Sequence, residues 1–350
     1  MQETDRPVGI VIGAWSGWYE VSLEGRSLLC RPRGRMRPRG SVWRQVRERE
    51  HGDAMAATDE GDAEADARWE RRAPHGAGPR RAEGEADFGA VLAGDRVRCT
   101  DLGDGEGRIE AVLPRRNVLP RPPVANVDLV LIVTAWAEPP FSFAYVDRLL
   151  VAVRRDACEA VLCLNKADLL TPDERTEAET QLAAYRTLGV PVVLTSARDG
   201  EGIEEARSLL RSRLGVLAGP SGVGKSALLS RICPERLLRS AALSARLGRG
   251  RHTTRHTELL PLAGAKTDGW VADTPGFSRL DLEDLDPADL GAYYPEFAAV
   301  AQDCHFHGCL HDGEPGCAIA EAVASGRIDV GRHERYRALL AEVRERFRVF

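Results

Sequence analysis

The sequence predicts a chain of three parts: a small N-terminal β-barrel of the OB-fold type, a central α/β unit, and a small C-terminal α-helical domain that binds zinc. Three observations lead to this prediction. Short strand patterns separated by turn residues fill the N-terminal part. Buried strand patterns alternate with helical patterns in the middle of the chain, which favours a parallel sheet covered on both faces. Three cysteines and one histidine lie close together near the C-terminal end.

The expected barrel is interrupted by a long polar segment. Strands are predicted at residues 8–12, 18–22, 27–30, 94–99 and 107–112. Short strands at this spacing are typical of a small barrel. Residues 41–87 are rich in Asp, Glu, Arg, Gly and Ala and contain few aliphatic residues. Such a segment cannot bury enough apolar surface to offset the cost of ordering, so we predict a disordered insertion.

A run of arginines follows the third expected strand, at Arg31, Arg33, Arg35, Arg37 and Arg39. The aromatic residues of the same region are Trp15, Trp18 and Tyr19. Phosphate contacts combined with stacking surfaces are typical of RNA binding. Two other interpretations stay open: the chain favours Arg over Lys throughout, and the aromatic side chains can equally belong to the barrel core.

The central unit is expected to contain buried strands at residues 128–134, 160–164, 190–194, 214–218 and 269–272. Helices are predicted at residues 143–154, 172–187, 202–213 and 225–232. An amphipathic helix at 331–350 would pack on the zinc domain or contact a partner. The expected division is a barrel over 1–113, a stiff basic linker over 114–126, the central domain over 127–282 and the zinc domain over 283–350.

A glycine-rich loop follows the apolar run 214–218 and opens a helix. The loop and the first residues of the helix are Gly219, Pro220, Ser221, Gly222, Val223, Gly224, Lys225, Ser226 and Ala227. Glycines let backbone N–H groups approach phosphates, and a helix N-terminus adds partial positive charge. Lys225 is expected to reach the β- and γ-phosphates, and Ser226 to ligate Mg²⁺. A chance glycine-rich turn is the alternative, and the flanking strand and helix argue against it.

A second loop, Asn165, Lys166, Ala167 and Asp168, follows the buried run 160–164. The Asp168 carboxylate can accept from both N1–H and the exocyclic amino group of guanine, a donor pair that adenine lacks. Asn165 is expected at the other base edge and the Lys166 stem along the ring. After the run 190–194, the backbone N–H groups of Ser196 and Ala197 are expected at the guanine O6. The expected ligands are therefore GTP and GDP.

The order of these loops predicts a circularly permuted P-loop GTPase, because the guanine loop precedes the phosphate loop instead of following it. Asp273 ends a strand-like segment after both. It is expected to hold Mg²⁺ through water, while the Gly276 N–H contacts the γ-phosphate.

Phe277 stands near the place where many GTPases carry a glutamine that orients the attacking water, and a phenyl ring cannot do this. His252 is the nearest candidate for that catalytic role, and a loop histidine without a role is the alternative. Lys225 and Thr254 are the other expected catalytic residues. Thr254 is the first choice, and Thr253 the second, for the threonine that contacts Mg²⁺.

The C-terminal cluster consists of Cys304, Cys309, His311 and Cys317. Three thiolates and one imidazole suit one tetrahedral, structural zinc ion. A group of structural thiols or a redox pair is the alternative. The chain's eight cysteines, without a signal-peptide pattern, do not indicate a disulfide scaffold.

Over nearly its whole length, the chain resembles the ribosome small-subunit-dependent GTPase A family, also called RsgA or YjeQ. The resemblance is carried by Gly-Asp-Arg-Val at 94–97, Pro-Arg-Arg-Asn at 114–117, Ala-Asn-Val-Asp at 125–128, the permuted loop order and the cysteine–histidine cluster. The insertion at 41–87 is a departure from the family pattern.

The resemblance implies an OB barrel, a permuted GTPase domain and a zinc domain. It implies GTP hydrolysis stimulated by the small ribosomal subunit during late maturation, contact with rRNA, and a cytoplasmic location. The alternative is a GTP-gated RNA-binding checkpoint protein that acts on another RNA or ribonucleoprotein. No run of about twenty apolar residues occurs, so no membrane role is expected, and we expect a monomer.

Overall fold

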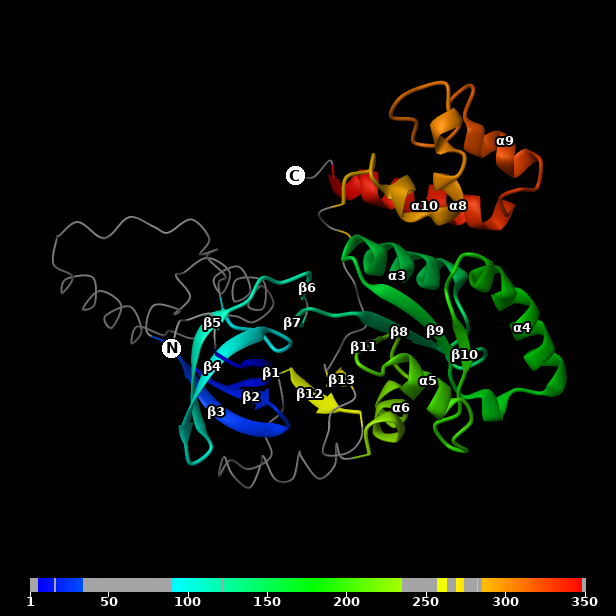
Figure 1. Ribbon diagram of the computed structural model, residues 1–350. Coiled ribbons are helices and arrows are strands. Elements are labelled where there is room, and N and C mark those ends of the chain that lie inside the picture. The colour runs from blue at the N-terminus through cyan, green and yellow to red at the C-terminus, as the bar shows by residue number, and fades with distance from the viewer. Residues whose placement is uncertain are drawn as a thin grey trace, which may run out of the picture.

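The computed structural model describes residues 6–15, 17–33, 90–120, 122–234, 257–262, 269–273, 282 and 285–347. A β-barrel, a central sheet flanked by helices and a C-terminal helical module follow one another (Figure 1). The predicted insertion at 41–87 lies outside the described residues, as do Arg35, Arg37 and Arg39. Within the described part of the chain, no helix combines the length and the apolar character needed to cross a bilayer.

The predicted OB-type barrel is confirmed. Its strands are β1 (Val8–Trp15), β2 (Trp18–Leu23), β3 (Arg26–Pro32), β4 (Arg96–Gly103) and β5 (Glu106–Val112). They pair in the order β1-β2-β3-β5-β4, and β4 returns to β1, so the barrel is closed. Alternate side chains such as Val21, Cys30 and Ile109 face inward and form a core of their own.

The segment predicted as a stiff linker is instead folded and fastened on both sides. Strands β6 (Val118–Pro120) and β7 (Pro123–Ala125) form a short antiparallel hairpin. Arg115 forms a bidentate ion pair with buried Asp95 of the barrel, with both nitrogen–oxygen distances at 2.7 Å. Proline-rich composition indicated a linker and did not reveal the strand pairing.

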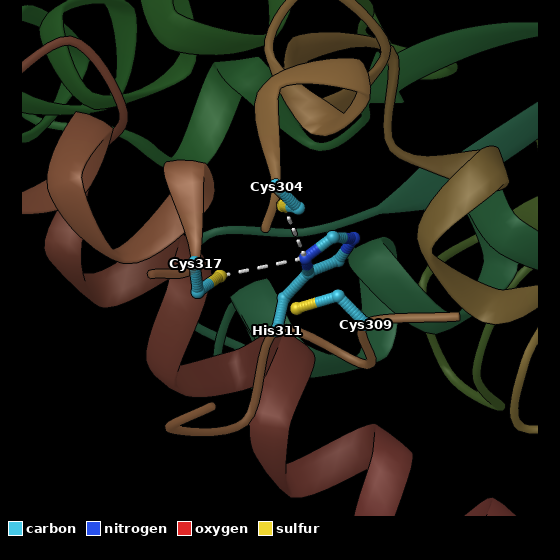
Figure 2. A group of neighbouring side chains, drawn as sticks. All are labelled: Cys304, Cys309, His311 and Cys317. Carbon is cyan, nitrogen blue, oxygen red and sulfur yellow. Dashed lines mark hydrogen bonds between the residues drawn. The ribbon is translucent and has the colours of Figure 1, made fainter. Parts of the chain in front are cut away.

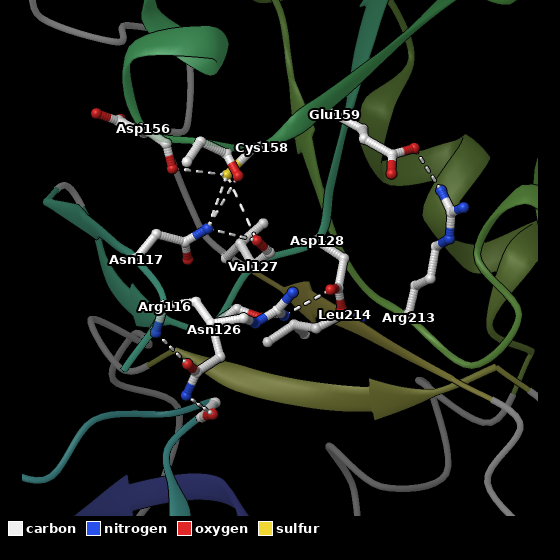
Figure 3. A network of polar contacts seen from close by, with 12 residues as sticks. Arg116, Asn117, Asn126, Val127, Asp128, Asp156, Cys158, Glu159, Arg213 and Leu214 are labelled. Carbon is white, nitrogen blue, oxygen red and sulfur yellow. Dashed lines mark hydrogen bonds and ion pairs between the residues drawn. The ribbon is translucent and has the colours of Figure 1, made fainter. Parts of the chain in front are cut away.

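Two asparagines connect this hairpin to its neighbours (Figure 3). The Asn126 amide donates to the Gly94 carbonyl at 2.9 Å and accepts from the Arg116 N–H at 2.9 Å. The Asn117 amide donates to the Val127 carbonyl at 2.8 Å. Gly94 has a φ of +89°, and a Cβ there would lie 2.0 Å from the Ala125 carbonyl oxygen, so the barrel and the hairpin approach as closely as backbones can.

The central sheet has the order β10-β9-β8-β11-β13-β12. Its strands are β8 (Leu129–Thr134), β9 (Glu159–Leu164), β10 (Val192–Leu194), β11 (Leu214–Ala218), β12 (Glu258–Pro261) and β13 (Trp270–Asp273). The strands are parallel except β12, which runs antiparallel to β13. β12 also pairs with β1 at Gly13 and Glu258, so barrel and central strands belong to one continuous sheet.

Helices cover both faces of the central sheet, as predicted. On one side, α3 (Phe143–Arg155) and α4 (Pro172–Thr187) pack on Val130 and Ile132. On the other side, α5 (Ile203–Leu209) and α6 (Lys225–Ile232) pack on Leu129, Leu131 and Val133. Helix α5 ends earlier than the predicted 202–213, in a turn where Ser212 has a φ of +57°.

The C-terminal module consists of short helices around one long helix. They are η3 (Leu290–Tyr293), α8 (Pro295–Ala298), η4 (Ala301–Asp303), α9 (Ala318–Ala324) and α10 (Val330–Phe347). The module lies against α3 (Figure 1). Its aromatic core, which includes Tyr294, Phe297 and Tyr336, is continuous with the apolar cluster under α3 and α4.

A buried carboxylate joins this module to the central domain. Asp147 of α3, only 2% exposed, accepts from Arg332 Nη1 at 2.5 Å, Arg335 Nε at 2.6 Å and the Tyr185 hydroxyl at 2.7 Å. Arg332 also donates to Glu296 of α8 at 2.5 Å. We call these five residues the Asp147 cluster. The predicted C-terminal helix thus packs on both the module and the central domain.

Candidate nucleotide site and metal centre

The phosphate loop, residues 219–224, connects β11 to α6 as the sequence predicts. Gly219, Gly222 and Gly224 have φ values of +147°, +85° and +90°, a region of backbone conformation that favours glycine. A Cβ on Gly219 would lie 2.0 Å from the Val133 carbonyl oxygen. The loop is therefore pressed against the end of β8.

Lys225, the first residue of α6, folds back over this loop. Its Nζ donates to the carbonyl oxygens of Gly219 and Pro220, both at 2.7 Å. Burial lowers the pKa of the Lys225 ammonium group. A cation held beside the N-terminus of α6 favours a polyanion at this position.

Asn165 fastens the guanine loop to the phosphate loop. Its Nδ2 donates to the Val223 carbonyl at 2.8 Å, and its Oδ1 accepts from the Thr195 hydroxyl at 3.1 Å. A Cβ on Gly224 would lie 2.5 Å from the same Nδ2. Asn165 was predicted to contact a base edge, and its larger observed role is to bring three loops together.

Asp168 is held in place by the loop after β10. Its Oδ1 accepts from the Ser196 hydroxyl at 2.8 Å, and its side chain remains 10% exposed. The Ser196 backbone N–H, predicted to contact the guanine O6, instead donates to the Glu201 carbonyl at 3.0 Å. The contacts of Asp168 and of the Ala197 N–H with guanine stay predictions.

Lys166 begins the short helix η2 (Ala167–Leu169) with a φ of +64°. Its Nζ donates to the Glu138 carbonyl at 2.8 Å, so the side chain reaches across the nucleotide side of the sheet to the loop after β8. The placement of its stem along a base stays a prediction.

Two contributors to the site were missed in the sequence. Thr195 orients the Asn165 amide, as described above. Arg231, in the last turn of α6, donates to the carbonyl oxygens of Ala197 and Arg198 at 2.6 and 2.5 Å. An arginine at a helix end carries no sequence signal for such a contact, because its partners lie more than thirty residues away.

Only part of the expected Mg²⁺ site lies within the described residues. Ser226 lies at the start of α6 and Asp273 ends β13, next to β11 in the sheet. A hydroxyl and a carboxylate are the hard oxygen donors that Mg²⁺ prefers. His252, Thr253, Thr254 and Gly276 lie outside the described residues, so their roles stay predictions.

The four predicted metal ligands converge on one point (Figure 2). Their ligand atoms all lie within 4.8 Å of one another. His311 Nδ1 is 3.7 Å from Cys304 Sγ and 3.5 Å from Cys317 Sγ. Tetrahedral zinc with ordinary bond lengths separates such atoms by about 3.6 Å. The donor set and its geometry therefore fit a structural zinc ion, with Nδ1 as the imidazole ligand.

Helix α10 packs against the loop that carries the metal ligands. His333 Nε2 lies 2.9 Å from the His311 carbonyl oxygen, and the Tyr336 hydroxyl donates to the Leu310 carbonyl at 2.7 Å. Glu314 accepts from the backbone N–H groups of Leu310 and Asp312 and so closes the loop between the ligands. Groups that orient metal ligands in this way hold the loop in its binding shape.

The fold and these sites define a class: a circularly permuted P-loop GTPase with an N-terminal OB barrel and a C-terminal cysteine–histidine module. The family model for the RsgA GTPase matches residues 112–283. The chain is similar over 98% of its length to small ribosomal subunit biogenesis GTPase RsgA of two organisms. The identity is 37% for Shouchella clausii (strain KSM-K16) and 40% for Moorella thermoacetica (strain ATCC 39073 / JCM 9320), with 99% of each relative covered. The chain belongs to the RsgA GTPase family.

Solved structures agree with this assignment. The crystal structure of YjeQ from Thermotoga maritima has a TM-score of 0.71 at 31% identity, covering 97% of this chain and 98% of that one. The crystal structure of YloQ, a circularly permuted GTPase, has a TM-score of 0.70 at 29% identity, covering 99% and 97%. The predicted family and fold class are thereby confirmed.

Proposed function

We propose that this chain is a GTPase of small ribosomal subunit biogenesis, which hydrolyses GTP to GDP and phosphate with a turnover that the bound subunit stimulates. The relatives carry this function in their names, over almost their full lengths. The observation that carries the proposal is the side chain of Asn165, which joins the guanine loop to the phosphate loop. A base and a triphosphate must be held in one fixed relation, and this contact provides it.

The three parts of the chain have separate tasks in this proposal. The barrel, residues 1–113, and the zinc domain, residues 283–350, contact the subunit and its rRNA. The central domain, residues 127–282, binds the nucleotide, and residues 114–126 connect it to the barrel. Arg31 of the barrel stacks over the Trp18 ring at 3.8 Å, a pairing that suits RNA contact.

Within the nucleotide site, Lys225 contacts the β- and γ-phosphates, and Asp168 selects guanine. Ser226, Asp273 and Thr254 hold the Mg²⁺ that neutralises phosphate charge. His252 orients the attacking water in place of the missing glutamine. The intrinsic rate is slow because Phe277 cannot position water, and the subunit brings the His252 segment into place.

A multiple-turnover GTPase assay with and without purified small subunits tests the proposal, at about 50 and about 200 mM salt. We expect strong stimulation at low salt that fades as salt rises, because rRNA phosphates form the docking surface. His252→Ala should lower the stimulated rate by about a hundredfold or more and leave GTP affinity unchanged.

Lys225→Ala is the comparison variant, since it should weaken GTP binding and turnover together. An unchanged rate with subunits at low salt would contradict the ribosomal function and leave a permuted GTPase without a known partner. If subunits stimulate the His252→Ala variant as they stimulate the wild type, the function stands and the water-orienting group lies elsewhere.

A further inference from the structure

A band of arginines crosses the outer surface of the barrel. Arg31 on β3 lies opposite Arg108 on β5 in the parallel register of these strands. The next residue on β5, Ile109, belongs to the barrel core, as does Cys30 before Arg31. Because side chains alternate along a strand, Arg31, Arg108 and Glu110 all face outward.

Glu110 lies at the centre of this band and is 4% exposed. Its Oε1 accepts from Arg108 Nε at 2.7 Å and from the Thr100 hydroxyl at 3.0 Å. Its Oε2 lies 3.1 Å from Arg6 Nη1 and 3.6 Å from Arg33 Nη1. Three guanidinium groups therefore share one carboxylate, and the group as a whole is positive.

The geometry around Glu110 leaves binding capacity toward solvent. The Arg33 and Arg108 side chains are 59% and 48% exposed. Arg6 Nη1 is buried beside Glu110 Oε2, at 3.1 Å but without hydrogen-bond geometry, so this ion pair does not use its full bonding capacity. Burial raises the pKa of Glu110, but hydrogen bonds from Arg108 and Thr100 outweigh it and keep the pKa below its usual range. The carboxylate thus stays charged and holds the guanidinium groups in place.

We propose that Arg6, Arg33 and Arg108, oriented by Glu110, form a binding site for a backbone phosphate of single-stranded RNA. The planar fork of arginine suits phosphate oxygens, and three forks around one point suit a single phosphodiester. The inference rests on the proposed function, since rRNA is the RNA that this barrel would meet.

The neighbouring side chains favour RNA over an acidic peptide. Trp18 lies next to Arg31 across β2 and β3, since Tyr19 pairs with Cys30 in the antiparallel register. The Arg31 guanidinium covers the Trp18 ring at 3.8 Å, which gives a flat cationic surface beside the phosphate site. An unpaired base can stack on such a surface, whereas a carboxylate side chain cannot.

The test measures binding of the full-length protein to a labelled oligouridylate and, separately, to purified small subunits, across about 50 to 200 mM salt. For single strands the salt slope is about 0.7 for each phosphate neutralised. Arg108→Gln and Arg33→Gln should each weaken RNA binding several-fold and make the slope smaller by about that amount. Arg108→Lys should keep the slope, because it keeps the charge.

Arg175→Gln is the matched control, since Arg175 is a surface arginine on α4 that pairs with Glu201. It should leave both affinity and slope unchanged. Arg33 lies at the barrel surface, so its variant tests the site even if Arg108→Gln unfolds the barrel.

Wild-type slopes in both the Arg33→Gln and Arg108→Gln variants would overturn the site, as would stronger competition by polyglutamate than by oligouridylate. If the oligouridylate results hold but small subunits neither bind nor stimulate the wild type, the phosphate site stands and the ribosomal function fails. If subunits bind and stimulate while the oligouridylate slopes do not change, the function stands and the site fails.

Discussion

The barrel and the C-terminal module are attached to the same central domain by different means. The barrel is joined through backbone: β1 pairs with β12 at Gly13 and Glu258, and Gly94 lies against the Ala125 carbonyl. Its buried side-chain contacts are a neutral amide, Asn126, on the Gly94 carbonyl, and the ion pair of Arg115 with Asp95. The module is joined through side chains alone: a shared apolar cluster, and the buried Asp147 carboxylate between Arg332 and Arg335.

Because of this difference, different substitutions should weaken the two junctions. A backbone junction depends on close approach, so it fails when an atom is added. A junction of buried charges depends on balance, so it fails when a charge is removed. The barrel is thus built into the sheet, whereas the module packs against α3 through side chains.

The largest loss of stability at either junction is expected from Asp147→Ala. Removing one partner of a buried ion pair costs about 3–5 kcal/mol, because Arg332, 5% exposed, would lose its main counter-charge. We expect α10 and α3 to lose protection in hydrogen-exchange mass spectrometry while the barrel strands keep theirs. Equal loss of protection in barrel and module would show that the two junctions are not independent.

An intermediate effect is expected from Gly94→Ala, which adds one methyl group at the barrel junction. Strained backbone costs about 1–3 kcal/mol, and the Ala125 carbonyl must also move. Gly103→Ala is a matched control, because Gly103 has a φ of +90° but a methyl group added there would meet no atom within 4 Å. Hydrogen exchange in β1 and β12 should rise only for Gly94→Ala, and the same rise in both variants would remove close approach as the cause.

The smallest effect is expected from Glu342→Gln at the edge of the module junction. Glu342 pairs with Arg148 at 2.6 Å, but it is 37% exposed. Such a surface pair contributes about 0–1 kcal/mol. The midpoint of thermal unfolding should shift little, and a shift as large as that of Asp147→Ala would mean that exposed charges also hold the module.

The sequence predicted the parts of the fold whose signals are local. The bounds predicted for helix α4 match the observed ones, and Thr171 and Glu174 form a capping box at its start. Strand β12 was missed, because a run of only four residues carries little periodicity. The β6–β7 hairpin was missed because its prolines indicated a linker rather than paired strands.

For the sites, the residue types were predictable and their connections were not. Glycines and ligand cysteines are recognisable because their chemistry restricts the sequence at fixed spacing. Asp147 reads as an ordinary charged helix residue, since its partner Arg332 lies 185 residues away in the chain. The Glu110 site was likewise missed, because a charged residue in the alternating pattern of a strand is usually exposed to solvent.

The two pairings of strand β1 determine the order in which parts of the chain can fold during synthesis. Its first half pairs with β4 within the first 112 residues, so the barrel can close early. The pair at Gly13 can form only after Glu258 has been synthesised, and β11, which carries the phosphate loop, can pair with β13 only after Trp270–Asp273 has been synthesised. Unpaired strand edges in a growing chain are prone to wrong association. The nucleotide site of this protein is therefore completed late in translation, after the barrel has folded.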